Sequence, residues 1–384
     1  MLSKLKGSYL SYLLAYFFFF AAMGLFLSMM SIYLEGIGKN SGQIAFIISA
    51  GGLITLGLQP LLGYLADKTR SPRNVSAVSM VLALIAGATY SSLRSDLALF
   101  IVFGITSAII MSVSLLMERI AIKSKHDYGK IRIWGSIGFA SAAQTSAFIY
   151  DAISPTATFI FFVIAVVITI LLYFTLDDHK GEEETTEKSN ISVAVITRAL
   201  LSNKAYLMFL LICFIFQGAS TTGNTYFPLL IKATGGNVSM IGTAILISTL
   251  FEVPIVLYST KFFNTLRLKA LMLMAFIIMI SRFAWYSTLP SAVAITYVFF
   301  FQALSTMLFV MVTNQALLRL VEEEHFNTAL SISAVIGRGF GVMFFQNILG
   351  QMLIGRDLSF LYTSLSILTV VGLVIAIFIP LDRA

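Results

Sequence analysis

The sequence has few charged residues and almost no cysteine. Only 11% of its 384 residues are Asp, Glu, Lys or Arg, whereas soluble domains average about 25%. The chain therefore lacks the charge to cover a soluble surface of its length, which argues against a soluble enzyme, a nucleic-acid-binding protein and a disordered protein. The single cysteine, Cys213, excludes a disulfide within the chain and argues against a cysteine-ligated metal site.

Groups that carry catalysis are also scarce. The three histidines, His126, His179 and His325, fall in predicted loops, so imidazole cannot relay protons within the membrane core. The sequence contains no recognisable nucleophile–base pair, phosphate-binding loop or metal cluster. We therefore predict no enzyme activity, no catalytic residue, no metal site and no cofactor other than a coupling proton.

Long apolar runs dominate the sequence instead, and 58% of the residues are hydrophobic. A transmembrane helix needs about 20 apolar residues, whereas the strands of a membrane barrel alternate over about 10. The unbroken runs here are of the longer kind, so we predict an all-α membrane protein. The twelve predicted spans are 9–34, 43–64, 75–93, 97–120, 131–151, 156–176, 205–231, 239–260, 268–288, 291–318, 327–354 and 358–379.

One long polar break divides these spans into six and six. It covers residues 177–204 and is rich in Asp and Glu. We predict an N-terminal half at 1–176, a cytoplasmic linker at 177–204 and a C-terminal half at 205–384. This division is typical of transporters in which two six-helix halves rock about a central site.

Lysine and arginine in the predicted loops set the orientation. Seventeen of them lie on the side of the two termini, and four lie on the other side: Lys39, Arg94, Lys232 and Arg356. Basic residues accumulate on the cytoplasmic side of membrane proteins. We therefore predict a plasma-membrane protein with both termini in the cytoplasm, and we read the net charge of +7 as this bias rather than as a sign of nucleic-acid binding.

The loop after the second span carries a motif over residues 63–73, GYLADKTRSPR. It resembles the G-x-L-a-D-r-x-x-x-R loop between the second and third helices of the major facilitator superfamily. The resemblance implies a conformational latch made of Gly63, Asp67, Arg70 and Arg73, which does not bind substrate. Gly63 would permit close helix approach, and Asp67 would accept from a helix N-terminus or pair with an arginine.

Further segments resemble the lactose-permease branch of that superfamily, which includes oligosaccharide–proton symporters and phenylpropionate and nucleoside uptake proteins. They are residues 59–63, QPLLG; residues 128–139, YGKIRIWGSIGF; and the aromatic run at 16–20. Glu252-Val253-Pro254 and Arg282 also match. The resemblance covers nearly the whole chain and implies the major facilitator fold, with uptake by alternating access driven by a proton gradient.

The resemblance also implies roles for single residues. Arg132 matches the arginine that bonds sugar hydroxyls, and Glu252, Arg282 and Arg338 match or lie near the proton-coupling positions. The chain departs from the lactose permease elsewhere: Ser114 replaces the sugar-binding carboxylate, and Phe139 replaces the stacking tryptophan, with Trp134 close by. Gln302, Ser305, Thr221 and Asn224 fall near other acidic or histidine positions. Lactose is therefore a doubtful substrate, and coupling does not simply follow the lactose route.

Charged residues within the predicted spans indicate function independently of the family resemblance. Such groups cost about 2.5–3.5 kcal/mol at mid-bilayer and usually face the bundle interior in pairs. A buried acid such as Glu252 beside an arginine can carry a proton, because burial favours its neutral form and the cation favours its charged form. The alternative is a structural ion pair that locks helices together.

Arg132 presents a planar fork suited to hydroxyls or a carboxylate, or else it is an interfacial anchor. Glu118 and Arg119 point about 100° apart on one helix, and we expect Glu118 to pair with Arg132. The substrate-binding candidates are Arg132, Glu118, Trp134, Phe139, Asn224 and Gln302, with Tyr16 and Phe20 as further stacking residues.

The leading hypothesis is a monomeric, proton-coupled importer of a small polar solute such as a sugar or glycoside, with protons and membrane lipid as its other partners. Uptake of an aromatic acid or a nucleoside is the first alternative, since Arg132 and Arg338 would suit a carboxylate. Drug efflux is less favoured because the predicted cavity is rich in arginine. A membrane sensor or scaffold is the alternative outside transport.

Overall fold

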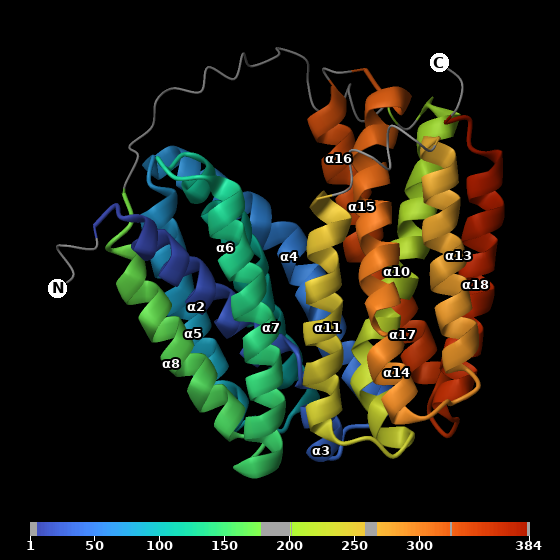
Figure 1. The fold of residues 1–384 in the computed structure, drawn as a ribbon, viewed down its shortest axis with the longest axis horizontal. Coiled ribbons are helices and arrows are strands. Elements are labelled where there is room, and N and C mark those ends of the chain that lie inside the picture. Colours follow the sequence, from blue (N-terminus) through green and yellow to red (C-terminus); the bar gives the residue numbers. More distant parts are fainter. Residues whose placement is uncertain (1–5, 178–199, 201, 258–266, 323–324, 382–384) are drawn as a thin grey trace. The chain divides into compact units, whose positions relative to one another are not determined.

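The structure is a computed structural model that describes residues 6–177, 200, 202–257, 267–322 and 325–381 (Figure 1). Its described secondary structure is helical, and the helices correspond one by one to the twelve predicted spans. The first six spans are formed by α2 (Tyr9–Leu27) with α3 (Met30–Gly36), α4 (Ser41–Thr69), α5 (Pro72–Tyr90), α6 (Asp96–Ile122), α7 (Tyr128–Ala152) and α8 (Ala157–Tyr173). The last six are formed by α10 (Lys204–Ala233), α11 (Val238–Leu257), α13 (Leu268–Tyr286), α14 (Ala292–Val298) with α15 (Phe300–Leu320), α16 (Phe326–Ala334) with η2 (Val335–Gly341) and α17 (Val342–Met352), and α18 (Leu358–Phe378).

Short polar residues start many of these helices. The side chains of Asn40, Asp127 and Asp357 each accept a hydrogen bond from a backbone N–H in the first turn of α4, α7 and α18. Such caps satisfy N–H groups that have no partner within the helix. The end of α4 is set by Arg70, whose left-handed φ of 52° stops the helix inside the loop motif.

Nine helical segments among the described residues are long and apolar enough to cross a membrane. Three other helices do not meet this criterion. The apolar segments of α8 (Ala157–Tyr173) and α11 (Val238–Glu252) are too short, and α7 carries many polar residues along its length. Polar residues on a membrane helix usually face the bundle interior or a water-filled cavity, so we expect the polar side of α7 to face the interior of the bundle.

The chain divides into two compact units. Unit 1 comprises residues 1–186 and 237–246, and unit 2 comprises residues 187–236 and 247–384. The predicted linker at 177–204 lies largely outside the described residues, so its bounds and those of the two halves stay predictions. The two units are described separately below.

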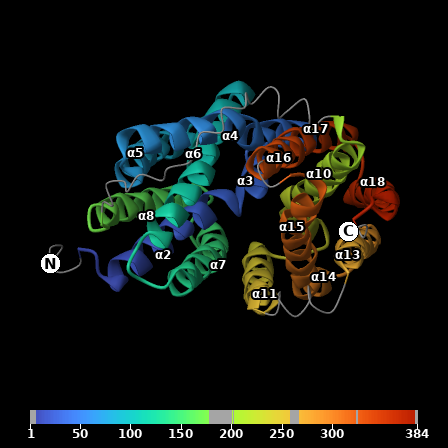
Figure 2. The same ribbon diagram turned by 90° about the horizontal axis from the view of Figure 1, so that it is seen from above.

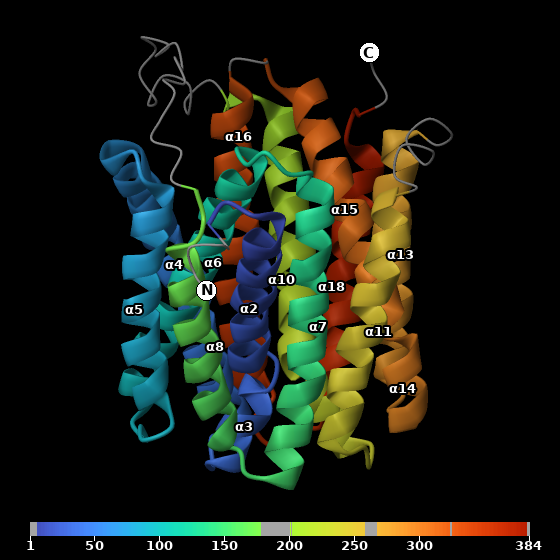
Figure 3. The same ribbon diagram turned by 60° about the vertical axis from the view of Figure 1, so that its left-hand side comes forward.

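In unit 1, α2 lies between α7 and α8 (Figure 3). Glycines allow the contact with α7: a Cβ at Gly138 would lie 2.3 Å from the carbonyl oxygen of Phe17, and one at Gly24 would lie 2.8 Å from that of Phe139. No side chain fits at these distances. Because small residues let helix backbones meet in a membrane, these glycines fix α7, and hence Arg132, against the first span.

We expect Gly138→Ala to destabilise the protein by about 1–3 kcal/mol, the usual cost of overpacking, because its new methyl group meets backbone that cannot move aside. Gly57→Ala in α4 is the matched control, since a Cβ there meets nothing within 4 Å. Thermal unfolding of the purified variants measures the difference. Equal unfolding midpoints for the two variants would show that α2 and α7 are not packed this closely.

In unit 2, α10 packs on η2, α17 and α18, and α13 packs on α15 and α18 (Figure 2). A Cβ at Gly341 would lie 2.6 Å from the carbonyl oxygen of Phe214, and one at Gly337 would lie 3.0 Å from that of Cys213. The π-helical turn η2 therefore presents its glycines to α10. A π-helical turn inside a membrane helix is uncommon and is frequent at functional sites.

Candidate functional site

The main polar cluster of unit 1 joins α6 to the first turns of α7. Arg132 Nη1 donates to Glu118 Oε1 at 2.8 Å and to the hydroxyl of Tyr128 at 2.6 Å, and the Tyr128 hydroxyl donates to Glu118 Oε1 at 3.1 Å. Asp127 caps α7, which places Tyr128 and Arg132 one turn apart on the same side of the helix. The predicted pairing of Glu118 with Arg132 is confirmed.

This cluster keeps capacity for a ligand. The Arg132 side chain is 61% exposed and the Glu118 side chain 35% exposed. The bonds that Arg132 makes to described residues all use Nη1, so Nε and Nη2 have no partner among them. A solute beside the cluster would meet two free donor groups, a carboxylate acceptor and a tyrosine ring, which is the set of groups that recognises hydroxyls.

The aromatic candidates take different faces of α7. At 100° per residue, Phe139 lies about 20° from Arg132 around the helix and Trp134 about 200°. Both side chains are half-buried. Tyr16 and Phe20 of α2 have ring centroids 5.7 Å apart and pack where Gly135 leaves space, one turn after Arg132. Phe139 therefore shares the face of Arg132, while Trp134 points to another side of α7, and the binding roles of both stay predictions.

Arg119 turns away from Glu118, as expected from their positions on α6, and forms an ion pair with Asp67 of α4. Of the two partners predicted for Asp67, a helix N-terminus or an arginine, the structure shows the arginine, and this pair joins the latch motif to α6. Arg73 Nη1 donates to the carbonyl oxygen of Leu176 at 3.0 Å, which holds the start of α5 to the end of α8. The described part of unit 1 shows no close helix approach at Gly63, where a Cβ would meet nothing within 4 Å.

We expect Asp67→Asn to slow transport several-fold with little change in solute affinity. The Asp67 side chain lies at the end of α4 and pairs with Arg119, and it makes no contact with the Glu118–Arg132 pair. An exposed pair also contributes little to stability, so folding should survive. Initial uptake rates in proteoliposomes and binding in detergent separate the two effects. Arg119→Gln removes the same pair and should slow transport equally; a large loss of affinity in either variant would place the pair in the binding site.

In unit 2, Glu252 lies half-buried in α11. Ser248, one turn before Glu252, donates to Gln302 Oε1 at 3.0 Å. Residues four apart share a helix face, so Gln302 adjoins the face of α11 that carries Glu252. Ser305 instead donates to the carbonyl oxygen of Ala275 in α13 and is fully buried, which gives it a packing role.

Arg282 of α13 is buried and forms no ion pair with a described residue. It is 4% exposed, and its three side-chain nitrogens have no hydrogen-bond partner among the described residues. Its guanidinium carbon lies 4.9 Å from the ring centroid of Phe283 and 5.9 Å from that of Tyr286. Arg282 therefore does not form the alternative structural ion pair with any described residue, and the rings of Phe283 and Tyr286 lie beside its guanidinium instead.

Arg338 and Asn224 are the remaining polar candidates of unit 2, and they lie on η2 and α10. Arg338 is exposed within η2, beside the glycines that pack on α10. Asn224 is half-buried on α10 and makes no hydrogen bond to a described residue. No ion pair joins Arg338 to another described side chain, so its role in coupling stays a prediction.

Some residues near the sites were not predicted from the sequence. Tyr128 bridges Glu118 and Arg132, and Gln346 of α17 donates to the hydroxyl of Thr225 at 2.7 Å. Gln217 adds a half-buried amide two turns before Asn224 on α10. Helical spacing in the sequence could have identified Tyr128 and Gln217. Tyr128 stands four residues before Arg132, and Gln217 stands seven before Asn224, and polar residues at such spacing in an apolar span mark one helix face. Among the described residues, no group of three or more His, Cys, Asp or Glu is placed to hold a metal ion.

Comparison with known proteins defines the class. The solved structure of the nucleoside transporter NupG superposes with a TM-score of 0.82 at 19% identity, covering 98% of this chain and 99% of that chain. This chain therefore has the same fold as that structure. Residues 9–363 match the MFS_1 like family, and the chain belongs to this family.

Two curated relatives carry functional names. The maltose permease of Geobacillus stearothermophilus is 28% identical over 369 residues, which cover 94% of this chain and 92% of that protein. The probable 3-phenylpropionic acid transporter of Escherichia coli (strain K12) is 29% identical over 133 residues, which cover 33% of this chain and 34% of that protein. These similarities fit the lactose-permease-like branch to which the sequence motifs pointed.

Proposed function

We propose that this membrane transporter is a proton-coupled symporter that imports a sugar or glycoside by alternating access. The observation that carries the proposal is the cluster of Glu118, Tyr128 and Arg132, in which a charged donor and a charged acceptor meet at a partly exposed position. Hydrogen bonds to charged groups are stronger than neutral ones. A polyol can both donate to Glu118 and accept from Arg132.

The charge balance of the cluster favours a neutral solute over an anion. Arg132 already has Glu118 as its counter-ion at 2.8 Å, so an incoming carboxylate would compete with Glu118 and bring a second negative charge beside it. A sugar hydroxyl adds no charge. This supports a sugar over an aromatic acid, although a nucleoside ribose presents similar hydroxyls and is the second candidate.

Proton coupling is proposed to involve Glu252, Arg282 and Arg338 in unit 2. Glu252 supports this as a half-buried acid whose helix face adjoins Gln302. Arg282, which is buried and has no ion-pair partner among the described residues, supports it as a fixed positive charge whose influence is little screened. The surplus of Lys and Arg on the side of the termini supports a plasma-membrane location with cytoplasmic termini, and we propose that the chain works as a monomer.

The experiment is solute uptake by purified protein in liposomes under an imposed proton gradient, inside alkaline. Maltose, uridine and 3-phenylpropionate represent the three solute classes, and a cationic dye tests for efflux. A thermal-shift screen of the same solutes should use a detergent without a sugar headgroup, because a maltoside detergent would itself occupy a sugar site. We expect a disaccharide to accumulate and to raise the unfolding midpoint.

Accumulation of uridine or phenylpropionate without any sugar would replace the proposed substrate class. Sugar uptake that does not change with the proton gradient would refute proton coupling but would still support a sugar as the substrate. Glu118→Gln is the matched variant for the substrate argument: it leaves Arg132 without its counter-ion, so affinity for an anionic solute should rise relative to that for a sugar.

A further inference from the structure

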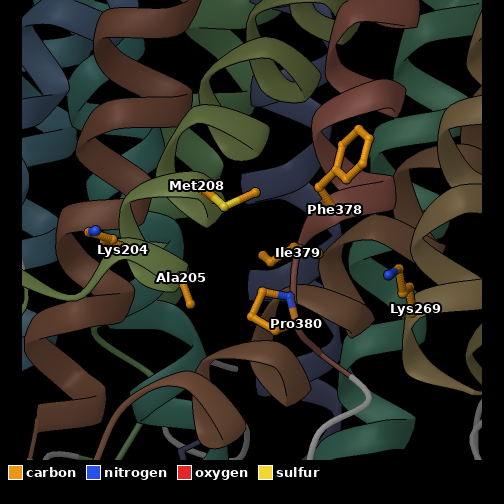
Figure 4. A pocket seen from close by; sticks show the side chains of 7 residues that line it. All are labelled: Lys204, Ala205, Met208, Lys269, Phe378, Ile379 and Pro380. Carbon is orange, nitrogen blue, oxygen red and sulfur yellow. The ribbon is translucent and has the colours of Figure 1, made fainter.

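A cavity of about 540 Å³ lies in unit 2, between the start of α10, the start of α13 and the end of α18. Lys204 and Lys269 stand on opposite sides of the cavity, with Ile379 and Pro380 between them (Figure 4). The cavity belongs to one unit and is lined by none of the candidate substrate or coupling residues. Its size is in the range of cavities that hold small organic ligands.

The polar part of this cavity is positive. The side chains of Lys204 and Lys269 have no hydrogen-bond or ion-pair partner among the described residues, and no described acidic residue lines the cavity. Both lysines lie in the first turn of their helices, α10 and α13, neither of which has an acid there. Helix N-termini carry partial positive charge, so the helices add to the charge of the two ammonium groups and the site favours an anion.

The rest of the lining is apolar. Met208, Phe378, Ile379 and Pro380 form this part, and Phe378 is 72% exposed. A free inorganic anion would gain nothing from such surface. An amphipathic ligand, with an anionic head and hydrocarbon tails, would contact both parts at once.

The position of the cavity along the helices agrees with such a ligand. Lys204 is the first residue of its apolar span, Lys269 the second residue of its span, and Phe378 the last residue of another. These are the levels at which lipid headgroups meet hydrocarbon. The predicted orientation places these ends on the cytoplasmic side, where basic pockets between transmembrane helices bind anionic headgroups.

We propose that this cavity binds an anionic phospholipid, with its negatively charged headgroup at the end lined by Lys204 and Lys269 and its acyl chains against Met208 and Phe378. The lipid would join the ends of α10, α13 and α18 and so stabilise the C-terminal half. The proposal concerns a lipid site separate from the transported solute and holds whichever solute is carried.

The test measures lipid binding to purified full-length protein in detergent, by native mass spectrometry and by thermal unfolding. Phosphatidylglycerol is compared with phosphatidylcholine, which has no net charge, and with glycerol 3-phosphate, which has no chains. The double variant Lys204→Gln/Lys269→Gln is compared with Lys125→Gln/Lys130→Gln, which removes the same charge from the start of α7 and the loop before it.

We expect phosphatidylglycerol to bind and to raise the unfolding midpoint of the wild type and of the control variant. Each lysine near an anionic headgroup contributes about a fivefold gain in affinity, so the Lys204→Gln/Lys269→Gln variant should bind about 30-fold more weakly. Equal binding by the two double variants would overturn the proposal, as would equal binding of phosphatidylcholine and phosphatidylglycerol. Stabilisation by glycerol 3-phosphate to the same extent as by the lipid would show a simple phosphate site and would also overturn it.

Discussion

Replacing Arg132 by lysine should weaken binding of the transported solute by about 10- to 150-fold, equivalent to the roughly 1.5–3 kcal/mol of a hydrogen bond to a charged group. The structure gives the reason. Arg132 uses Nη1 for both Glu118 and Tyr128 and leaves Nε and Nη2 for a solute. A lysine ammonium can satisfy Glu118 but offers no second, planar pair of donors. Calorimetry on the solute identified by uptake measures the change.

Folding should not suffer, because the Arg132 side chain is 61% exposed. Arg94→Lys is the control: Arg94 donates to the backbone carbonyls of Ser91 and Leu93 at the opposite end of the bundle and should leave affinity unchanged. If Arg132→Lys bound the solute as tightly as the wild type, Arg132 would be an interfacial anchor and the binding site would lie elsewhere.

Glu252→Gln should abolish accumulation of solute against its gradient while preserving exchange of solute across the membrane. Glutamine has nearly the shape of a protonated glutamic acid but cannot release a proton. If Glu252 carries or controls the transported proton, this variant can still move its solute but cannot couple the movement to a proton gradient. Proteoliposomes measure both activities, with an imposed pH gradient for accumulation and a solute-loaded interior for exchange.

Glu322→Gln provides the matched control for Glu252. The Glu322 side chain is 82% exposed just beyond α15 and lies 3.8 Å from His325, so losing its charge should change neither activity. Normal uphill accumulation by Glu252→Gln would remove Glu252 from the mechanism. Loss of exchange as well as accumulation would assign it to the solute site rather than to coupling.

Hydropathy predicted the number and order of the spans, because the length needed to cross a bilayer is a strong constraint on sequence. It did not predict where spans break. The first span is interrupted at Ser28 and Met29, and the tenth at Phe299, without proline or glycine at these positions. Such breaks depend on tertiary packing. The end of α4 was placed five residues early at 64, because the helix continues through polar residues until Arg70 stops it.

The candidate site was predictable where local geometry decided the outcome. Glu118 and Arg119 are adjacent on α6 and so had to face different neighbours, and the structure pairs them with Arg132 and Asp67. Arg282 was not predictable in this way. Its helical position shows that it faces the interior, but whether an acid or an aromatic ring meets it depends on side chains distant in the sequence, such as Tyr362, whose ring packs on Tyr286.

The π-helical turn η2 affects how the eleventh span of this chain should align with the same span of related proteins. A π-helical turn holds one more residue than an α-helical turn, so the faces of α16 and α17 are out of phase by about 100° relative to one continuous α-helix. A relative with a regular eleventh span would need one residue fewer between Val335 and Gly341 to keep the same packing on both sides. Alignments of this segment should therefore show a single-residue gap, and deleting one residue there should remove the π-helical turn while keeping Gln346 beside Thr225.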